Sequence, residues 1–276
     1  MRLAISNIAW DVPEDERVAA LLKRYAVDAI DIAPGKYFPE PAKASPEDIL
    51  AVKRWWASRG IEITGMQALL FGTSGLNVFG SVQSQEALLA HLNEVCRIAA
   101  GLGSTRLVFG SPKNRDRTGL DDAVAMDIAV DFFRRLGAIA QRHSVIVCLE
   151  PNPTCYGANF MTTSAETRAV VERVAHPCIR MQLDTGAITI NAEDPRQVVS
   201  DCAQLIGHIH ASEPALVPVG DGATDHAEFG RALSDSLRGH IVSIEMVATQ
   251  QEDHLASIER ALLVACRSYR DSESAA

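Results

Sequence analysis

The 276-residue sequence predicts an α/β fold, a single (β/α)8 TIM barrel. Short apolar runs alternate with amphipathic stretches along the whole chain, and eight such runs are found. The length also suits this barrel, which typically has about 250 residues. Because no linker or composition break divides the chain, we expect one domain over residues 1–270 and a frayed Ser/Glu/Ala tail over 271–276.

The eight apolar runs are short, as buried parallel strands are. We expect strands at Leu3–Ser6, Ala29–Ile32, Glu62–Met66, Arg106–Phe109, Val145–Leu149, Ile179–Leu183, Ile206–Ile209 and Val242–Ile244. The alternative is a doubly wound open sheet, which often has a glycine-rich phosphate loop after its first strand. Here the first strand is followed by Asn7-Ile8-Ala9-Trp10, so that loop is missing.

Helix start signals and apolar residues at helical spacing occupy the intervals between the strands. Ser45 followed by Pro46, for example, is typical of a cap with proline in the first helical position. We expect helices near Glu14–Tyr25, from Ser45, over Ser84–Ala100, over Asp121–Arg142, from Ser164 and from about Gln251 to Ser268.

Composition limits the class of partner. The formal net charge of -9 disfavours nucleic-acid binding, because an acidic surface repels phosphates. No apolar run approaches the roughly 20 residues that span a bilayer, and no signal-peptide pattern precedes the first strand. The six cysteines are scattered, which argues against disulfides and thiolate zinc sites. We expect a cytoplasmic protein that binds a small molecule, and the sequence leaves homo-oligomerisation open.

Four apolar runs in the second half of the chain end in a metal-binding side chain. These side chains are Glu150, Asp184, His210 and Glu245. Strand ends of a parallel barrel point to one face, so the four should converge, and crowded carboxylates repel unless a cation neutralises them. Oxygen-rich ligands without sulfur favour Mn²⁺ or Mg²⁺, while Co²⁺ and Zn²⁺ are also compatible. The sequence therefore predicts a divalent metal site.

Other polar residues at the same strand ends are candidates for substrate binding. Asn7 and Gln67 end the first and third strands. Lys113 and Arg115 follow the fourth strand, where they form either an anion clamp for a phosphate or carboxylate or a solvated loop. His208 lies two residues before the histidine ligand and therefore faces the same way, as a ligand or as a supporting histidine.

Five motifs carry a resemblance to a known family. They are CLEPN at 148–152, QLDTG at 182–186, HIHASE at 208–213, GDGATDH at 220–226 and SIEM at 243–246. Together they resemble the xylose isomerase-like barrel superfamily, which includes ketose 3-epimerases, hydroxypyruvate isomerases, inosose dehydratases and endonuclease IV. The resemblance covers essentially the whole chain, and it is specific for the superfamily but weak for the substrate.

The resemblance implies a metal-dependent isomerase or epimerase of a sugar, sugar acid or sugar phosphate. Glu150 and Glu245 would be metal ligands and also the catalytic acid–base pair that moves a proton through an enediolate. Glu213 and His226 belong to the matching motifs and join the substrate-binding candidates, although His226 also suits a further metal or loop packing.

Two departures from the epimerase pattern leave other reactions open. The histidine expected three residues after the aspartate ligand is Ala187, and Pro214-Ala215-Leu216 lacks the expected arginine. Because both groups orient the substrate, a dehydratase or hydrolase on the same scaffold is an alternative, as is a non-catalytic protein that kept the metal. An endonuclease is disfavoured, because Gln67 and Ala187 occupy positions where extra histidine ligands are expected.

Overall fold

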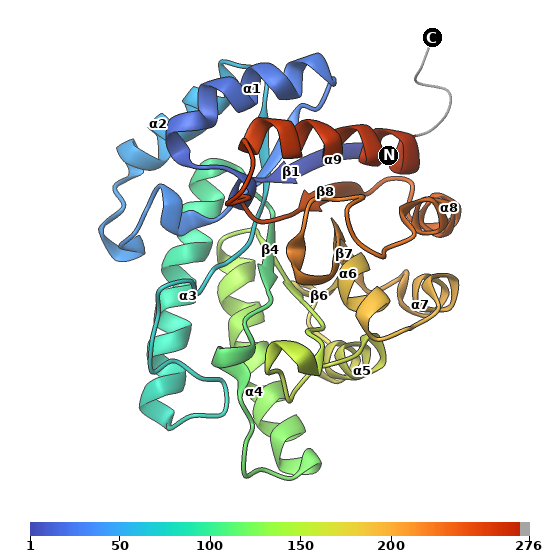
Figure 1. Cartoon of the computed structure of the whole chain (residues 1–276). Coiled ribbons are helices and arrows are strands. Elements are labelled where there is room, and N and C mark those ends of the chain that lie inside the picture. The colour runs from blue at the N-terminus through green and yellow to red at the C-terminus, as the bar shows by residue number, and fades with distance from the viewer. Residues whose placement is uncertain (271–276) are drawn as a thin grey trace.

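Eight parallel strands pair in chain order in the computed structural model, and β8 pairs with β1 to close the barrel (Figure 1). The predicted (β/α)8 fold is therefore confirmed. The structure describes residues 1–270, so the tail predicted at 271–276 lies outside it. The strands are β1 (Arg2–Ser6), β2 (Ala29–Ile32), β3 (Glu62–Met66), β4 (Arg106–Phe109), β5 (Ile146–Leu149), β6 (Ile179–Asp184), β7 (Ile206–Ser212) and β8 (Ile241–Glu245).

Nine α-helices occur in the described residues and surround the strands (Figure 1). They are α1 (Asp15–Arg24), α2 (Pro46–Ala57), α3 (Val82–Leu102), α4 (Asp122–Arg142), α5 (Ser164–Val174), α6 (Thr185–Ile190), α7 (Pro195–Cys202), α8 (His226–Ser236) and α9 (His254–Tyr269). Ser45 caps α2 as expected, since its side chain accepts a hydrogen bond from the Asp48 amide. The sequence analysis does not predict α6, α7 or α8. The first two have only six and eight residues, which is too short for a repeated helical period.

Two strands extend further toward the site than their apolar runs indicate. β6 continues to Asp184, and β7 continues past Ile209 to Ser212. In the barrel register Asp184 pairs with His210, and Ser212 pairs with Glu245. Polar residues therefore complete the strands at one end, where backbone pairing holds them in an extended conformation despite their low hydrophobicity.

The interior of the barrel holds a buried polar layer as well as an apolar core. Asp31, Gln182, His208 and His210 each expose 3% of their surface or less. Buried polar groups are costly unless they are paired or used, so this layer marks the functional end of the barrel. Among residues 1–270, no helix is both long enough and apolar enough to cross a membrane.

Candidate metal centre

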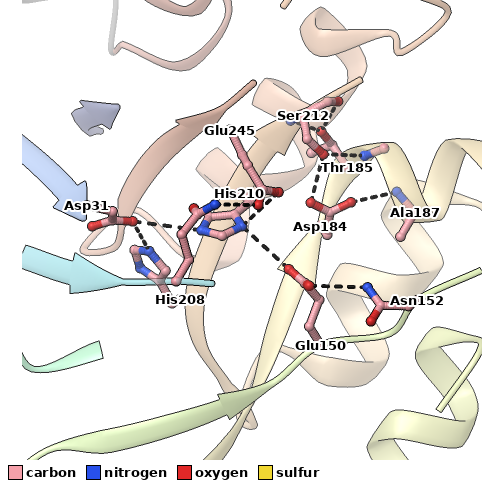
Figure 2. Close-up of polar contacts among 12 residues, drawn as sticks. Asp31, Glu150, Asn152, Asp184, Thr185, Ala187, His208, His210, Ser212 and Glu245 are labelled. Atoms are coloured by element: carbon pink, nitrogen blue, oxygen red, sulfur yellow. Dashed lines mark hydrogen bonds and ion pairs between the residues drawn. The ribbon is translucent and has the colours of Figure 1, made fainter. Parts of the chain in front are cut away.

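The structure brings together the four side chains predicted as metal ligands. Glu150 follows β5, Asp184 and Glu245 end β6 and β8, and His210 lies near the end of β7. One ligand atom from each lies within 4.8 Å of the others, and all four residues are buried (Figure 2). The Nδ1 atom of His210 is 3.1 Å from Glu245 Oε2 and 3.5 Å from Glu150 Oε1.

Asp184 is fixed by hydrogen bonds to both carboxylate oxygens. Oδ1 accepts a hydrogen bond from the Ala187 amide at 2.6 Å, because Asp184 is also the N-cap of α6. Oδ2 accepts one from the Ser212 hydroxyl at 2.7 Å (Figure 2). Strand end and helix start thus coincide at one residue, which places the carboxylate rigidly at the mouth of the barrel.

The two glutamates are each held by an amide side chain. Gln67 Nε2 donates to Glu245 Oε1 at 2.8 Å, and Asn152 Nδ2 donates to Glu150 Oε2 at 3.2 Å. The other oxygen of Glu150, Oε1, is buried without a hydrogen-bond partner. His210 Nδ1 faces this oxygen at 3.5 Å, which is longer than a normal hydrogen bond, so its negative charge is only partly offset and the arrangement fits a metal ion at the centre of the cluster.

Crowded charges shift the protonation of this cluster. Burial raises the pKa of Asp184 to about 8, and the negative charges of Glu245 and Glu150 act in the same direction. Burial opposes the charged form of His210, but the charge of Glu245 and contacts to Asp31 and Glu150 raise its pKa well above the usual value. Three carboxylates around one imidazole leave an excess of negative charge, which a divalent cation would offset.

A second buried layer lies beneath the ligands and includes a residue that the sequence analysis missed. Asp31 of β2 accepts a hydrogen bond from His208 Nε2 at 2.6 Å, and its Oδ2 is 3.8 Å from His210 Nε2 (Figure 2). Burial opposes ionisation of Asp31, but the charge of His208 dominates and lowers the pKa of this carboxyl group. His208 thus supports the site from below, and a lone acid within the apolar run Ala29–Ile32 was the signal for Asp31.

Lys113 and Arg115, the two cations considered for an anion clamp, do not line the pocket above the ligands. Arg115 is fully buried; Nη1 donates to the Glu150 carbonyl at 2.7 Å, and Nη2 donates to Asn152 Oδ1. Its guanidinium therefore stands behind Glu150 and braces the loop after β5. Lys113 is exposed, and neither cation lines the pocket above the ligands. Of the two interpretations left open by the sequence, the exposed position of Lys113 fits the solvated loop, while Arg115 is folded inward by the loop after β4.

Glu213 and His226 pair with each other after β7. The Glu213 carboxylate accepts hydrogen bonds from the Gly220 and Thr224 amides, each at 2.9 Å, and lies 3.0 Å from His226 Nε2. Burial opposes ionisation of Glu213, yet these bonds lower its pKa to about 2. His226 Nδ1 lies 2.6 Å from the Tyr269 hydroxyl, so both ring nitrogens are engaged in holding the loop to α9.

Asn7, a candidate for substrate binding, makes a structural hydrogen bond instead. Its Oδ1 accepts a hydrogen bond from the Ala33 amide at 2.7 Å, which ties the loop after β1 to the end of β2. Its Nδ2 is buried without a partner. Asn7 does not line the pocket above the ligands, and Gln67 reaches the site through Glu245.

A pocket of about 300 Å³ opens above the ligand cluster. This volume is at the small end for ligand sites. It is lined by Gly110, Pro112, Glu150, Asn152, Pro153, Tyr156, Asp184, Gly186, Ala187, Glu213, Ala215, Leu216 and Glu245. The pocket therefore combines a carboxylate floor with walls from the loops after β4, β5, β6 and β7.

Comparisons with known proteins give a family and several similar structures. The family model described as "Xylose isomerase-like TIM barrel" matches residues 19–266. A D-psicose 3-epimerase structure determined with D-fructose is 20% identical with a TM-score of 0.79, covering 97% of this chain and 99% of that chain. The 3-keto-D-glucoside 4-epimerase YcjR from E. coli is 17% identical with a TM-score of 0.79, covering 97% and 99%. The IolI protein with a bound zinc atom is 16% identical with a TM-score of 0.74, covering 98% and 100%.

Proposed function

The chain belongs to the xylose isomerase-like TIM-barrel family, and from that premise we propose that it is a divalent-metal-dependent isomerase or epimerase of a carbohydrate-like substrate. The observation that carries this proposal is the buried set of three carboxylates and one imidazole at the floor of a small pocket. The names of the similar structures, which include two sugar epimerases and a zinc-containing protein, support the same direction.

Glu150, Asp184, His210 and Glu245 would hold the ion, and their oxygen-rich set favours Mn²⁺ or Mg²⁺, with Co²⁺ and Zn²⁺ also compatible. When bound, a divalent cation polarises a carbonyl group and stabilises negative charge that develops on its oxygen.

The two glutamates would transfer the proton. Glu150 and Glu245 come from β5 and β8, and both approach the imidazole of His210 while facing the pocket. One carboxylate would remove a proton from the carbon beside the substrate carbonyl to give an enediolate, and the other, in its protonated form, would donate a proton that comes from solvent to the enediolate carbon. Such a positioned base adds roughly 10²–10⁴-fold to the rate. Asn152 and Gln67 would keep the two carboxylates aimed at the pocket, since each holds one oxygen.

A dehydratase or hydrolase is the second candidate. Ala187 and Leu216 line the pocket, so the described lining has no histidine or arginine to orient a sugar. The glutamate that removes the proton could then act as the base in an elimination that releases water from the substrate. Product masses separate the two reactions, because isomerisation conserves mass and loss or gain of water does not.

Solvent exchange tests the proposal directly. The protein loaded with Mn²⁺ is incubated in D₂O with ketoses and simple hydroxy ketones, and deuterium incorporation at carbon is followed by NMR. We expect exchange in the wild type and a loss of at least about 10²-fold in Glu150→Gln and Glu245→Gln. The exposed Glu252→Gln is the matched control. Absence of exchange with every compound despite bound Mn²⁺ would contradict the proposal, and unchanged cellular activity of both glutamine variants would indicate a non-catalytic protein.

A further inference from the structure

The pocket is lined by the carboxylates of the ligand cluster and by a larger set of mostly apolar residues. The carboxylates of Glu150, Asp184 and Glu245 form its floor, with the Asn152 amide beside them. The walls are formed by Pro112, Pro153, Tyr156, Ala187, Ala215 and Leu216. Most hydrogen-bonding side chains of the lining thus belong to the ligand cluster or to Asn152 beside it, and most of the other lining residues are apolar.

Apart from Asn152, two polar side chains outside the ligand cluster border the pocket, Tyr156 and Glu213. The Tyr156 hydroxyl accepts a hydrogen bond from the Ala215 amide at 2.7 Å, which bridges the loops after β5 and β7. Glu213 borders the pocket, but its oxygens face the Gly220 and Thr224 amides and His226. No lysine or arginine is found among the described residues that line this pocket. The walls therefore offer no basic side chain to a phosphate or carboxylate, and to the hydroxyl groups of a substrate they offer mainly the proton of the Tyr156 hydroxyl.

The loop that carries the apolar wall is held in an unfavourable backbone conformation. Ala215 and Leu216 have φ values of 59° and 53°, in the left-handed region that residues with side chains rarely adopt. The bridge to Tyr156 and the bond from the Val247 amide to the Leu216 carbonyl at 3.0 Å maintain this conformation. These two bonds therefore keep Leu216 at the wall of the pocket despite the cost of its backbone conformation.

We infer that the substrate is an uncharged hydroxy ketone whose two oxygens face the ligand cluster and whose remaining carbons are predominantly apolar. This inference rests on the proposed function and narrows its substrate range, because it excludes sugar phosphates, sugar acids and extended polyols. Each methylene buried against the wall would add about fourfold to affinity. Each buried hydroxyl left without a partner would lose about tenfold.

Two four-carbon ligands isolate this difference, because neither closes into a ring and both carry the same hydroxy-ketone head. They are 1-hydroxybutan-2-one and L-erythrulose, which has two further hydroxyl groups. Titration calorimetry with the Mn²⁺-loaded protein measures binding without turnover. We expect 1-hydroxybutan-2-one to bind at least about tenfold more tightly, and 1-hydroxyhexan-2-one to gain about 15-fold more from its two additional methylenes.

Leu216→Ala tests the wall itself. It should remove most of the gain between the four-carbon and six-carbon hydroxy ketones, whereas Leu263→Ala on α9 should keep it, because Leu263 is 40% exposed and lies outside the pocket. Equal or tighter binding of L-erythrulose, failure of both four-carbon ligands to bind, or an unchanged chain-length gain in Leu216→Ala would overturn the inference.

The proposed function and the inference about the substrate can be contradicted separately. Tight binding of the apolar ligand without deuterium exchange contradicts only the proposed function, and exchange with a preference for L-erythrulose contradicts only the inference.

Discussion

Asp31 does not line the pocket, yet this single residue can influence how tightly the ligand cluster binds a metal ion. It accepts a hydrogen bond from His208 at 2.6 Å and lies 3.8 Å from the far nitrogen of His210, a distance at which its charge favours the imidazole ligand without a direct hydrogen bond. Carboxylates in this position raise ligand basicity and fix the ring, and their loss typically lowers metal affinity 10–100-fold.

We therefore expect Asp31→Asn to weaken Mn²⁺ binding by about 10–100-fold while the fold is retained, since the two side chains have the same shape. Affinity is measured by competition with a chelating indicator, and circular dichroism checks the fold. The exposed Asp235→Asn serves as a control for charge alone. A folded Asp31→Asn protein with wild-type affinity would show that His210 needs no such support.

Glu213 links a single carboxylate to stability against acid. Its pKa in the folded protein is about 2, below the usual value of 4.5, so its contribution is complete above pH 4.5 and is lost as pH falls toward 2. Between pH 5 and pH 3 the loss amounts to about 2 kcal/mol.

The pH dependence of unfolding by urea measures this contribution. We expect the free-energy gap between the wild type and Glu213→Gln to shrink by about 2 kcal/mol from pH 5 to pH 3, because the wild-type carboxylate becomes protonated on unfolding. The exposed Glu47→Gln should show no such change. A free-energy gap that does not change with pH would mean that the bonds to Gly220, Thr224 and His226 do not lower the pKa of Glu213 in the folded protein.

At the scale of elements, the strands and their end residues could be predicted from local sequence. Each strand of four to seven residues contains an apolar run of its own, although β6 and β7 extend past theirs, and chain order places the strand ends together once the barrel closes. What could not be predicted is set by partners distant in sequence. Asp31 and His208 are 177 positions apart, and His226 meets Tyr269 43 positions later. The inward turn of Arg115 depends on a carbonyl 35 positions away, and neither charge nor spacing encodes it.

The loop after β4 contributes to the candidate metal centre because its Gly110 leaves space for the Glu150 carboxylate. A Cβ atom at Gly110 would overlap Glu150 Oε2, so only glycine allows the carboxylate its observed position. The φ of Gly110 is not in the left-handed region, so alanine there strains the ligand and not the backbone.

Gly110→Ala should therefore displace Glu150 and lower Mn²⁺ affinity by at least about tenfold, with a change in unfolding free energy of less than about 1 kcal/mol. Gly239→Ala is the matched control, because a Cβ there meets nothing within 4 Å. Wild-type Mn²⁺ affinity in Gly110→Ala would show that Glu150 does not need this space.

For the whole molecule, the ligand cluster joins both halves of the barrel. The ligands follow or end β5 to β8, while Asp31 of β2 and Gln67 after β3 support them from the opposite side. A metal ion would therefore bind a geometry that exists only when the barrel is closed, and its binding energy would add to the stability of the entire fold.

Metal addition should accordingly stabilise the protein by about 2.7 kcal/mol at a free Mn²⁺ concentration 100 times its dissociation constant, and a chelator should reverse the effect. In a domain of this size the gain corresponds to a rise in melting temperature of roughly 5–10 °C, which scanning calorimetry measures. Asp184→Asn should abolish the response. Asp194→Asn, which changes the N-cap of α7 in the same way, should preserve it, because asparagine caps a helix as well as aspartate does. Of the two substituted aspartates, Asp184 belongs to the buried cluster and Asp194 does not. Equal Mn²⁺ responses in the two variants would therefore mean that the ion binds at another place on this acidic protein.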